Sequence, residues 1–278
     1  MSGGGGGTSG SMDGGVAVGG PDAGGDPSNG GAGGASGGAG GVSGGAGGVS
    51  GGAGGASGGA GGAPPPAVVV LFIYGVPAAA AEAVPAELGD AKVREQLQGL
   101  GFEAQVVSDM AVTTADVANA AAVYISESVD STKISSEVAS ALRTAPIPVV
   151  VNELYFGDEL RLIPADQSFR TGAISGQWKI VNTNHPLAAG RPLQTVEIWT
   201  GSPDFSYSEP PVKGTVIATD STGTWPTFFG FEKGEMMELS TMAPERRVLI
   251  AFQAEAPSSF TADGWALFNA AINWTLKK

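Results

Sequence analysis

Two apolar patterns alternate along the chain beyond residue 66. Continuous apolar runs rich in β-branched residues are typical of strands covered on both faces. Stretches whose apolar positions recur every three or four residues are typical of helices with one buried face. In the first half of this region the first pattern predicts strands at residues 67–74, 103–107, 121–126 and 149–151.

Predicted helices separate these strands. The polar residues expected to begin them are Asp90, Thr113 or Thr114, and Asp130 or Ser131. Strands that alternate with helices predict an α/β fold. Because crossovers are right-handed, few topologies remain, and we expect a flavodoxin-like three-layer sandwich with a parallel sheet in the order 2-1-3-4.

The second half of the body has a different pattern. Short strands separated by Gly and Pro predict an antiparallel hairpin extension, at residues 177–181, 195–200, 214–219, 227–232 and 236–239. A buried strand at 247–252 closes the parallel sheet. Thr261 then caps a last helix, on which Trp265, Phe268, Ile272 and Leu276 form an apolar stripe that we expect to be core.

Residues 1–66 lack both patterns. From Gly30 to Ala63 a seven-residue Gly/Ala/Ser unit repeats, marked by serines at 36, 43, 50 and 57. Ordering so many glycines costs backbone entropy that small side chains cannot offset. We therefore expect a disordered tether over residues 1–66, with a root-mean-square span of roughly 40–45 Å, and one α/β domain over residues 67–278.

Charge and composition exclude several function classes. All 14 basic residues lie beyond the tether, whose three acids are Asp13, Asp22 and Asp26, so 24 acids and 14 bases give the body a net charge of −10. An acidic body without a basic stripe argues against a nucleic-acid partner. The absence of cysteine excludes thiolate catalysis and zinc-thiolate sites, and a single histidine excludes sites with two imidazoles.

Two further classes of feature are missing from the sequence. No apolar run reaches the ~18 residues of a membrane span. The body contains no EF-hand loop, Walker loop or dinucleotide-binding turn, so we expect neither a metal nor a cofactor.

The order of several motifs resembles the trehalose-utilisation-like (ThuA-like) branch of the class I glutamine amidotransferase-like fold. The resemblance covers residues 67–277 and rests on Val68–Tyr74 with Leu100–Phe102, on Asn184–Gly190, and on Arg246–Phe252 with Trp265–Phe268 and Ala271–Trp274. The segments Val123–Val129 and Pro148–Glu153 are similar to a set of exported actinobacterial and myxobacterial domains of unassigned activity.

This chain departs from that resemblance at the positions that matter for catalysis. Glutamine amidotransferases place a cysteine nucleophile after a central strand, with His and Glu partners. Here the strand at 149–151 runs into Asn152 and Glu153. Many ThuA-like proteins end the closing strand in a Gly-His pair, where this chain has Gln253 and Ala254. No catalytic triad is therefore transferred to this sequence.

Ligands of open α/β sheets bind beyond the carboxyl ends of the strands. In this sequence those ends carry Gly75–Pro77, Ser126–Ser128 and Asn152–Tyr155. The candidate catalytic residues are Glu127, Glu153 and His185. The candidate ligand-binding residues are Ser126, Asn152, Tyr155 and Trp199.

Each candidate has a structural alternative, which we favour. Glu127 and Glu153 could divide into an acid and a base or hold Ca²⁺, or each could accept hydrogen bonds from a helix N-terminus. His185 could be a general base facing Glu153, or its ring could donate to a backbone carbonyl and fix the turn before Trp199. The aromatic rings of residues 178, 199, 207 and 225 could stack on a glycan if exposed, or belong to the core or its rim.

These observations favour a non-catalytic, monomeric α/β domain that binds a carbohydrate or another small ligand. The alternatives are a hydrolase or transferase that uses Glu127, Glu153 and His185, and a scaffolding role. A long Gly/Ala/Ser spacer is typical of exported surface proteins and lipoproteins, so we expect an extracellular or cell-envelope location. The alternative is the cytoplasm, since Met1 and Ser2 run straight into glycine without a basic, apolar leader.

Deleting residues 1–62 should leave the thermal midpoint of unfolding within about one or two degrees of the full chain, because a segment without core residues contributes little to stability. Calorimetry of both chains tests this. A large loss of stability would show that the tether packs on the body.

Overall fold

The computed structural model describes residues 68–75, 88–165, 170–172, 176–201, 205–208 and 210–276. The predicted tether at 1–66 and the turn residues Val76 and Pro77 lie outside the described residues.

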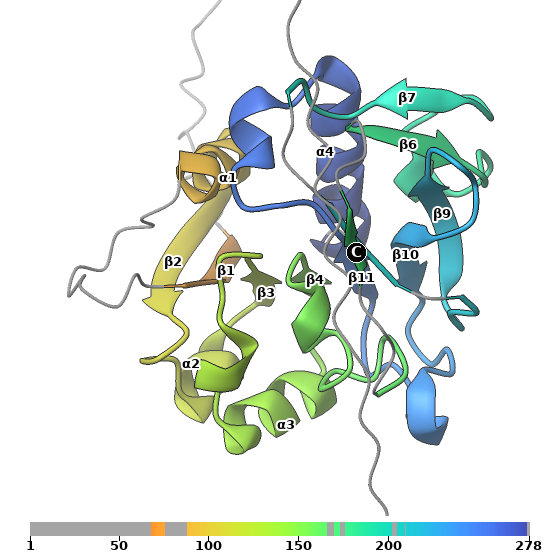
Figure 1. Cartoon of the computed structure of the whole chain (residues 1–278). Coiled ribbons are helices and arrows are strands. Elements are labelled where there is room, and N and C mark those ends of the chain that lie inside the picture. The colour runs from red at the N-terminus through yellow and green to blue at the C-terminus, as the bar shows by residue number, and fades with distance from the viewer. Residues whose placement is uncertain are drawn as a thin grey trace, which may run out of the picture. The chain divides into compact units, whose positions relative to one another are not determined.

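A nine-stranded mixed sheet runs through the body, in the order β2-β1-β3-β4-β11-β10-β9-β6-β7 (Figure 1). Its parallel part comprises β1 (Val68–Tyr74), β2 (Phe102–Ser108), β3 (Ala122–Ile125), β4 (Val149–Val151) and β11 (Arg247–Ile250). The antiparallel extension comprises β6 (Gln177–Ile180), β7 (Thr195–Glu197), β9 (Thr215–Asp220) and β10 (Pro226–Phe231). The predicted 2-1-3-4 order, the closing strand beside β4 and the antiparallel extension are confirmed.

Four helices cover the two faces of the parallel sheet. Helices α1 (Leu88–Gly99) and α4 (Ala262–Leu276) lie on one face, and α2 (Thr114–Asn119) and α3 (Ser136–Thr144) lie on the other (Figure 1). Alternate residues of β1 divide accordingly, since Phe72 belongs to the α1–α4 core and Leu71 to the α2–α3 core. The predicted three-layer sandwich is therefore confirmed. None of the helices in the described part is both long and apolar enough to cross a membrane.

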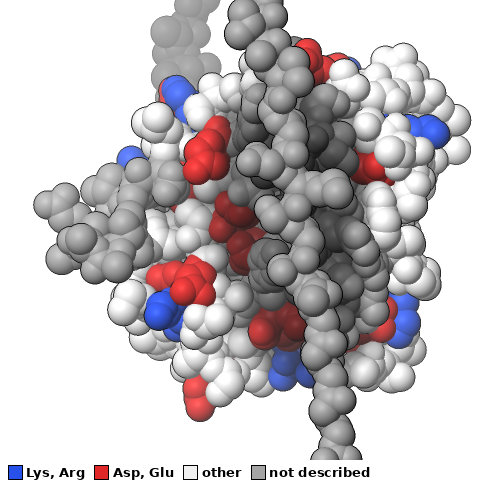
Figure 2. Space-filling model, viewed as in Figure 1, with Lys and Arg blue, Asp and Glu red and all other residues white. Residues whose placement is uncertain are grey.

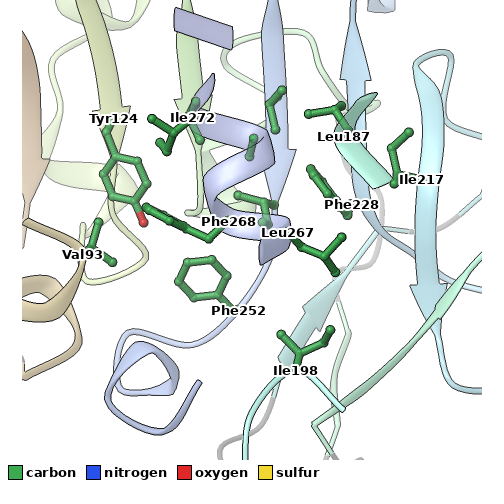
Figure 3. Close-up of a cluster of buried hydrophobic side chains, with 14 of the residues drawn as sticks. Val93, Tyr124, Leu187, Ile198, Ile217, Phe228, Phe252, Leu267, Phe268 and Ile272 are labelled. Carbon is green, nitrogen blue, oxygen red and sulfur yellow. The ribbon is translucent and has the colours of Figure 1, made fainter. Parts of the chain in front are cut away.

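The closing helix α4 supplies the centre of the larger core. Phe268 and Ile272 are fully buried, and Phe268 meets Tyr124 and Phe252 edge-on, with ring centroids 6.1 and 6.4 Å apart (Figure 3). Trp265 is only half-buried at the border of this cluster, 5.6 Å from the Phe268 ring. The predicted stripe is core along most of its length.

Short 3-10 helices complete the connections. They are η1 (Ser131–Lys133), η2 (Leu154–Phe156), η3 (Pro186–Ala188), η4 (Glu238–Ser240) and η5 (Ala256–Ser259). A separate two-stranded ladder, formed by β5 (Arg170–Gly172) and β8 (Phe205–Tyr207), was not predicted.

Two predicted helix starts are corrected. Asp90 lies inside the first turn of α1, because the helix already begins at Leu88. Asp130 accepts from the Thr132 N–H and caps η1, whereas Ser135 caps α3. The predicted Thr113 cap is confirmed by a reciprocal capping box with Asp116.

The predicted strand at 236–239 is wrong. This segment folds back on itself as η4, with Leu239 and Ser240 at φ values of 49° and 57°. Met237 is buried as an anchor and donates its N–H to the Thr241 carbonyl at 2.7 Å. Its apolar neighbours Met236 and Leu239 are exposed to solvent. The apolar segment is therefore a tight loop held by one buried side chain, and not a strand paired in a sheet.

Arg247 opens β11 and is 1% exposed. Its guanidinium donates to the carbonyls of Leu142 and Ala145 at the end of α3, and to those of Ile147 and Arg246. Burial lowers the pKa of Arg247 to about 10, so the side chain stays charged at neutral pH. A cation at a helix C-terminus is stabilised by the helix dipole.

The variant Phe268→Ala should lower the free energy of unfolding by about 3–5 kcal/mol, because it leaves a cavity at the contact between α4 and the sheet. The exposed control Met110→Ala (69% exposed) should change it by less than about 0.5 kcal/mol. Denaturant titration measures both. A change below about 1 kcal/mol for Phe268→Ala would contradict the observed packing of α4.

Candidate functional site

The carboxyl edge comprises the residues that follow β1, β2, β3, β4 and β11, together with the first turn of α1. Acidic side chains gather toward the middle of the face shown in Figure 2, in the region of β1 and β3, and most basic ones lie nearer its rim. The buried or half-buried acids of the carboxyl edge are Asp90, Asp109, Glu127 and Glu153.

Asp90 joins the ends of β1 and β3 to helix α1. Its carboxylate accepts from the hydroxyls of Ser126 and of Ser128, the latter at 2.5 Å, and Ser128 Oγ accepts from the Gly75 N–H at 3.0 Å. A side chain at Gly75 would place its Cβ 1.6 Å from the Ser128 carbonyl oxygen, so only glycine fits there. Ser126, a predicted ligand-binding candidate, is 1% exposed and serves as a buried link to α1.

Two more candidates fasten neighbouring strands to the segment after β11. Glu127 Oε2 accepts from the Ala254 N–H at 2.8 Å. Asn152 Oδ1 accepts from the Phe252 N–H at 2.9 Å, with the side chain 1% exposed. The favoured alternative for Glu127 is correct in kind, because the carboxylate accepts from backbone, although the donor belongs to a loop and not to a helix N-terminus.

Glu153 follows β4 and caps η2. Its Oε1 accepts from the Tyr155 N–H at 2.7 Å, and the residue is 4% exposed. Burial, with the nearby Glu127 charge second, raises the pKa of Glu153 to about 9. At neutral pH the side chain is therefore a carboxylic acid that can donate a hydrogen bond, next to a Glu127 carboxylate that can accept one. The prediction that these two residues follow neighbouring strands is confirmed, because β3 and β4 pair in parallel.

Tyr155 is the accessible aromatic residue of the carboxyl edge, with 45% of its surface exposed. Tyr124 lies deeper, and burial, together with Asp90 and Glu127, raises its pKa well above the ordinary value. The Tyr124 hydroxyl has no hydrogen-bond partner of regular geometry in the described part of the chain. Sequence reasoning missed both Asp90 and Tyr124 as members of this site, and the only signal was a phenol in an otherwise aliphatic strand.

Asp109 follows β2 and is another residue that the sequence did not single out. It is 3% exposed, and one oxygen accepts from the Asp130 N–H at 3.0 Å while the other has no described partner. Burial raises the pKa of Asp109. Across the described residues, no group of three or more His, Cys, Asp or Glu side chains is arranged to hold a metal ion.

His185 lies away from this edge. Its Nδ1 accepts from the Leu187 N–H at 3.2 Å and so caps η3, and its ring packs edge-on against Trp274 at 5.1 Å. The same Trp274 carries the Arg246 guanidinium over its ring at 4.8 Å. Burial lowers the pKa of His185 below its usual value, which keeps the accepting nitrogen unprotonated at neutral pH.

The geometry rules out a direct pair between His185 and Glu153. Arg246, which marks the position of His185, immediately precedes β11 at the amino end of the sheet, whereas Glu153 follows β4 at the carboxyl end. β4 and β11 are parallel and paired from Val149 onward. At ~3.3 Å per residue, the positions of Arg246 and Glu153 along the strand direction therefore differ by about 15 Å. A catalytic set that joins His185 directly to Glu153 does not fit this geometry, and the His185 ring packs in its turn as expected, although it accepts a hydrogen bond and does not donate one.

The aromatic residues proposed for glycan stacking are mostly core. Trp178 and Trp199 are 0% exposed and meet edge-on at 6.0 Å. Tyr207 is 7% exposed and packs against the half-buried Trp225. Trp199 therefore presents no ring face to a ligand, whereas Tyr155 is 45% exposed.

No protein-family model matches the chain, and no curated protein matches it either. Among solved structures, the chain is similar to a protein described as ThuA-like from Bacteroides uniformis, with 12% identity, a TM-score of 0.54, and coverage of 78% of this chain and 94% of that one. Further similar structures are a protein from Thermoplasma acidophilum described as part of a GMP synthase (10% identity, TM-score 0.45, 74% and 93% coverage) and PurLQS from Thermotoga maritima (9% identity, TM-score 0.43, 74% and 98% coverage). At this identity the ThuA-like structure shows a shared fold and nothing beyond it.

Glu153 should make the protein less stable as the pH rises. The unfolded chain releases this proton near pH 4.5 and the folded chain near pH 9, so between these values stability falls by about 1.4 kcal/mol per pH unit. Glu153→Gln keeps an oxygen acceptor for the Tyr155 N–H and removes this slope. Denaturant titrations at pH 5 and pH 8, with the exposed Glu103→Gln as control, measure it. Equal pH dependence of the variant and the unsubstituted chain would show that Glu153 ionises normally.

Proposed function

We propose that this chain is a non-catalytic binding domain whose carboxyl edge holds a small polar ligand, with a carbohydrate as the chemistry that fits best. The observation that carries this proposal is that the polar side chains of the edge accept hydrogen bonds from the protein itself. Asp90, Glu127, Asn152 and Glu153 each accept a hydrogen bond that fixes a strand end or a loop. Such an edge is rigid before any ligand arrives, which lowers the entropy cost of binding.

The same contacts argue against nucleophilic catalysis at this edge. A serine nucleophile needs an adjacent base that takes its proton. Ser126 and Ser128 donate to the Asp90 carboxylate, and the only histidine of the chain lies at the opposite end of the sheet. Cysteine, the nucleophile of the glutamine amidotransferases, is absent from the sequence.

A sugar matches the chemistry of three side chains at this edge. Glu153 as a neutral acid offers a donor, Glu127 offers an acceptor, and the exposed Tyr155 offers an apolar ring face. Sugar hydroxyls both donate and accept hydrogen bonds, and the C–H face of the ring packs on aromatic residues. We further propose that the Gly-rich segment displays this domain outside the cell or at the envelope. Fractionation of the producing cells tests that location.

Binding of the full chain to a panel of mono- and oligosaccharides, followed by calorimetry on those retained, tests the proposal. Tyr155→Ala should weaken binding about tenfold, by analogy with other lost aromatic contacts. Leu193→Ala, at an exposed position on a different part of the chain (69%), should leave the affinity unchanged. Uniform absence of binding, or equal loss in both variants, would remove the carbohydrate from the proposal.

A second candidate is acid–base catalysis by Glu153 and Glu127 on a carbohydrate-like substrate. The raised pKa of Glu153 beside Glu127 favours it, because paired carboxyls with separated pKa values are the acid and base of many glycosidases. Hydrolysis of nitrophenyl glycosides by the full chain, lost in Glu153→Gln, would favour this candidate over the binding domain.

A further inference from the structure

A cavity of about 680 Å³ lies at the opposite end of the sheet from the carboxyl edge. Its walls come from residues that precede β1, β3, β4 and β11, or open these strands, and from the ends of β10 and α4. Its volume falls within the ~300–1,000 Å³ that pockets for small molecules occupy. We call it the amino-edge cavity.

Part of the cavity lining is apolar. It comprises Val68, Ala121, Pro146, Ile147, Pro148 and Leu276. Val68 is 42% exposed although it opens a buried strand. An apolar ligand body placed here would remove this surface from water, which is favourable by about 25 cal/mol per Å².

The rim of the cavity is charged and held in place. Lys233 pairs with Glu245 at 2.5 Å and Arg246 pairs with Glu232 at 2.9 Å. The Arg246 guanidinium also donates to the Trp274 carbonyl at 2.7 Å and lies over the Trp274 ring. A guanidinium fixed by a carboxylate, a carbonyl and an aromatic face keeps its orientation, which suits recognition of an anionic group.

The charged residues that line the cavity balance one another. Lys233 faces Glu245, and Arg246 faces Glu232. Arg247 lies next to this lining, and its guanidinium donates to neutral backbone carbonyls, those of Ile147 and Arg246 among them. A lining without net charge repels an anion less than the rest of a body whose net charge is −10.

We propose that the amino-edge cavity binds a small amphipathic anion, an apolar ring or short alkyl chain that carries one carboxylate. The apolar body lies against Val68, Ile147 and Leu276, and the carboxylate lies toward Arg246, with Lys233 at the rim. A charge-assisted hydrogen bond to a guanidinium discriminates the anion from a neutral molecule of the same shape. This site is separate from the carboxyl edge and stands independently of the function proposed there.

Calorimetry of the full chain with 4-phenylbutyrate and with the matched neutral 4-phenylbutan-1-ol tests the proposal. The acid should bind at least about tenfold more tightly than the alcohol, as expected for one charge-assisted hydrogen bond. Inorganic phosphate should not compete with the acid. Equal affinity for acid and alcohol, effective competition by phosphate, or no binding of the acid at its solubility limit would each overturn the proposal.

Variants locate the site. Val68→Trp fills the cavity from a partly exposed position and should abolish binding, while Leu193→Trp, at an exposed position outside the cavity, should bind as the unsubstituted chain does. Arg246→Gln should reduce the affinity for the acid to that for the alcohol. If that variant fails to fold, Lys233→Gln, whose side chain is 65% exposed, should still weaken acid binding selectively. Unchanged binding in Val68→Trp would place the ligand elsewhere and reject the proposal.

Discussion

The position of strand β11, secured by its first residue, is the constraint on which the rest of the structure depends. β11 pairs in parallel with β4 on one side and antiparallel with β10 on the other, so it joins the two halves of the sheet. Arg247 fixes this joint by donating to the carbonyls at the end of α3 and before β4. Those carbonyls would otherwise be unsatisfied at a helix terminus, and the guanidinium would be a buried charge without partners. The guanidinium and these carbonyls satisfy one another's hydrogen-bonding needs. Their hydrogen bonds help to hold β4 and β11 in parallel register.

That register also determines what stands at each end of the sheet. At the carboxyl end it brings Asn152 beside Phe252 and Glu127 beside Ala254, so the loops after three strands hold one another through side-chain to backbone hydrogen bonds. Polar side chains there make hydrogen bonds that hold the loops in place, and burial keeps Glu153 neutral. An edge of this kind is suited to shape-specific binding, because nothing in it must move to receive a ligand. At the amino end the same register leaves the cavity at the strand starts, with Arg246 in its lining and Arg247 bonded to the carbonyl of the lining residue Ile147.

The sequence predicted most of the parallel half because its signals are local. Runs such as residues 68–74 and 149–151 are apolar on both faces and have only one stable environment, the centre of a covered sheet. The strand predicted at residues 236–239 was wrong because the apolar signal there is ambiguous. A tight loop with one buried anchor has the same apolar composition as a strand. For the site, Glu127 and Glu153 could be paired because each follows an adjacent parallel strand. His185 could not be placed, because nothing in its own turn tells which end of the sheet the chain has reached, and Trp199 could not be assigned to core or surface without the hairpin partners that bury it.

The start of β1 has a mechanical consequence for a chain attached through the residues that precede Val68. The seven residues of β1 pair in parallel with β2 along their whole length and with β3 along four positions. A pull on Val68 along the strand axis would load the hydrogen bonds of both ladders together in shear, whereas an antiparallel edge hairpin would open one bond at a time. The body would then resist extraction through both ladders at once, and tension on the attachment would reach the carboxyl edge only after crossing the length of the strand.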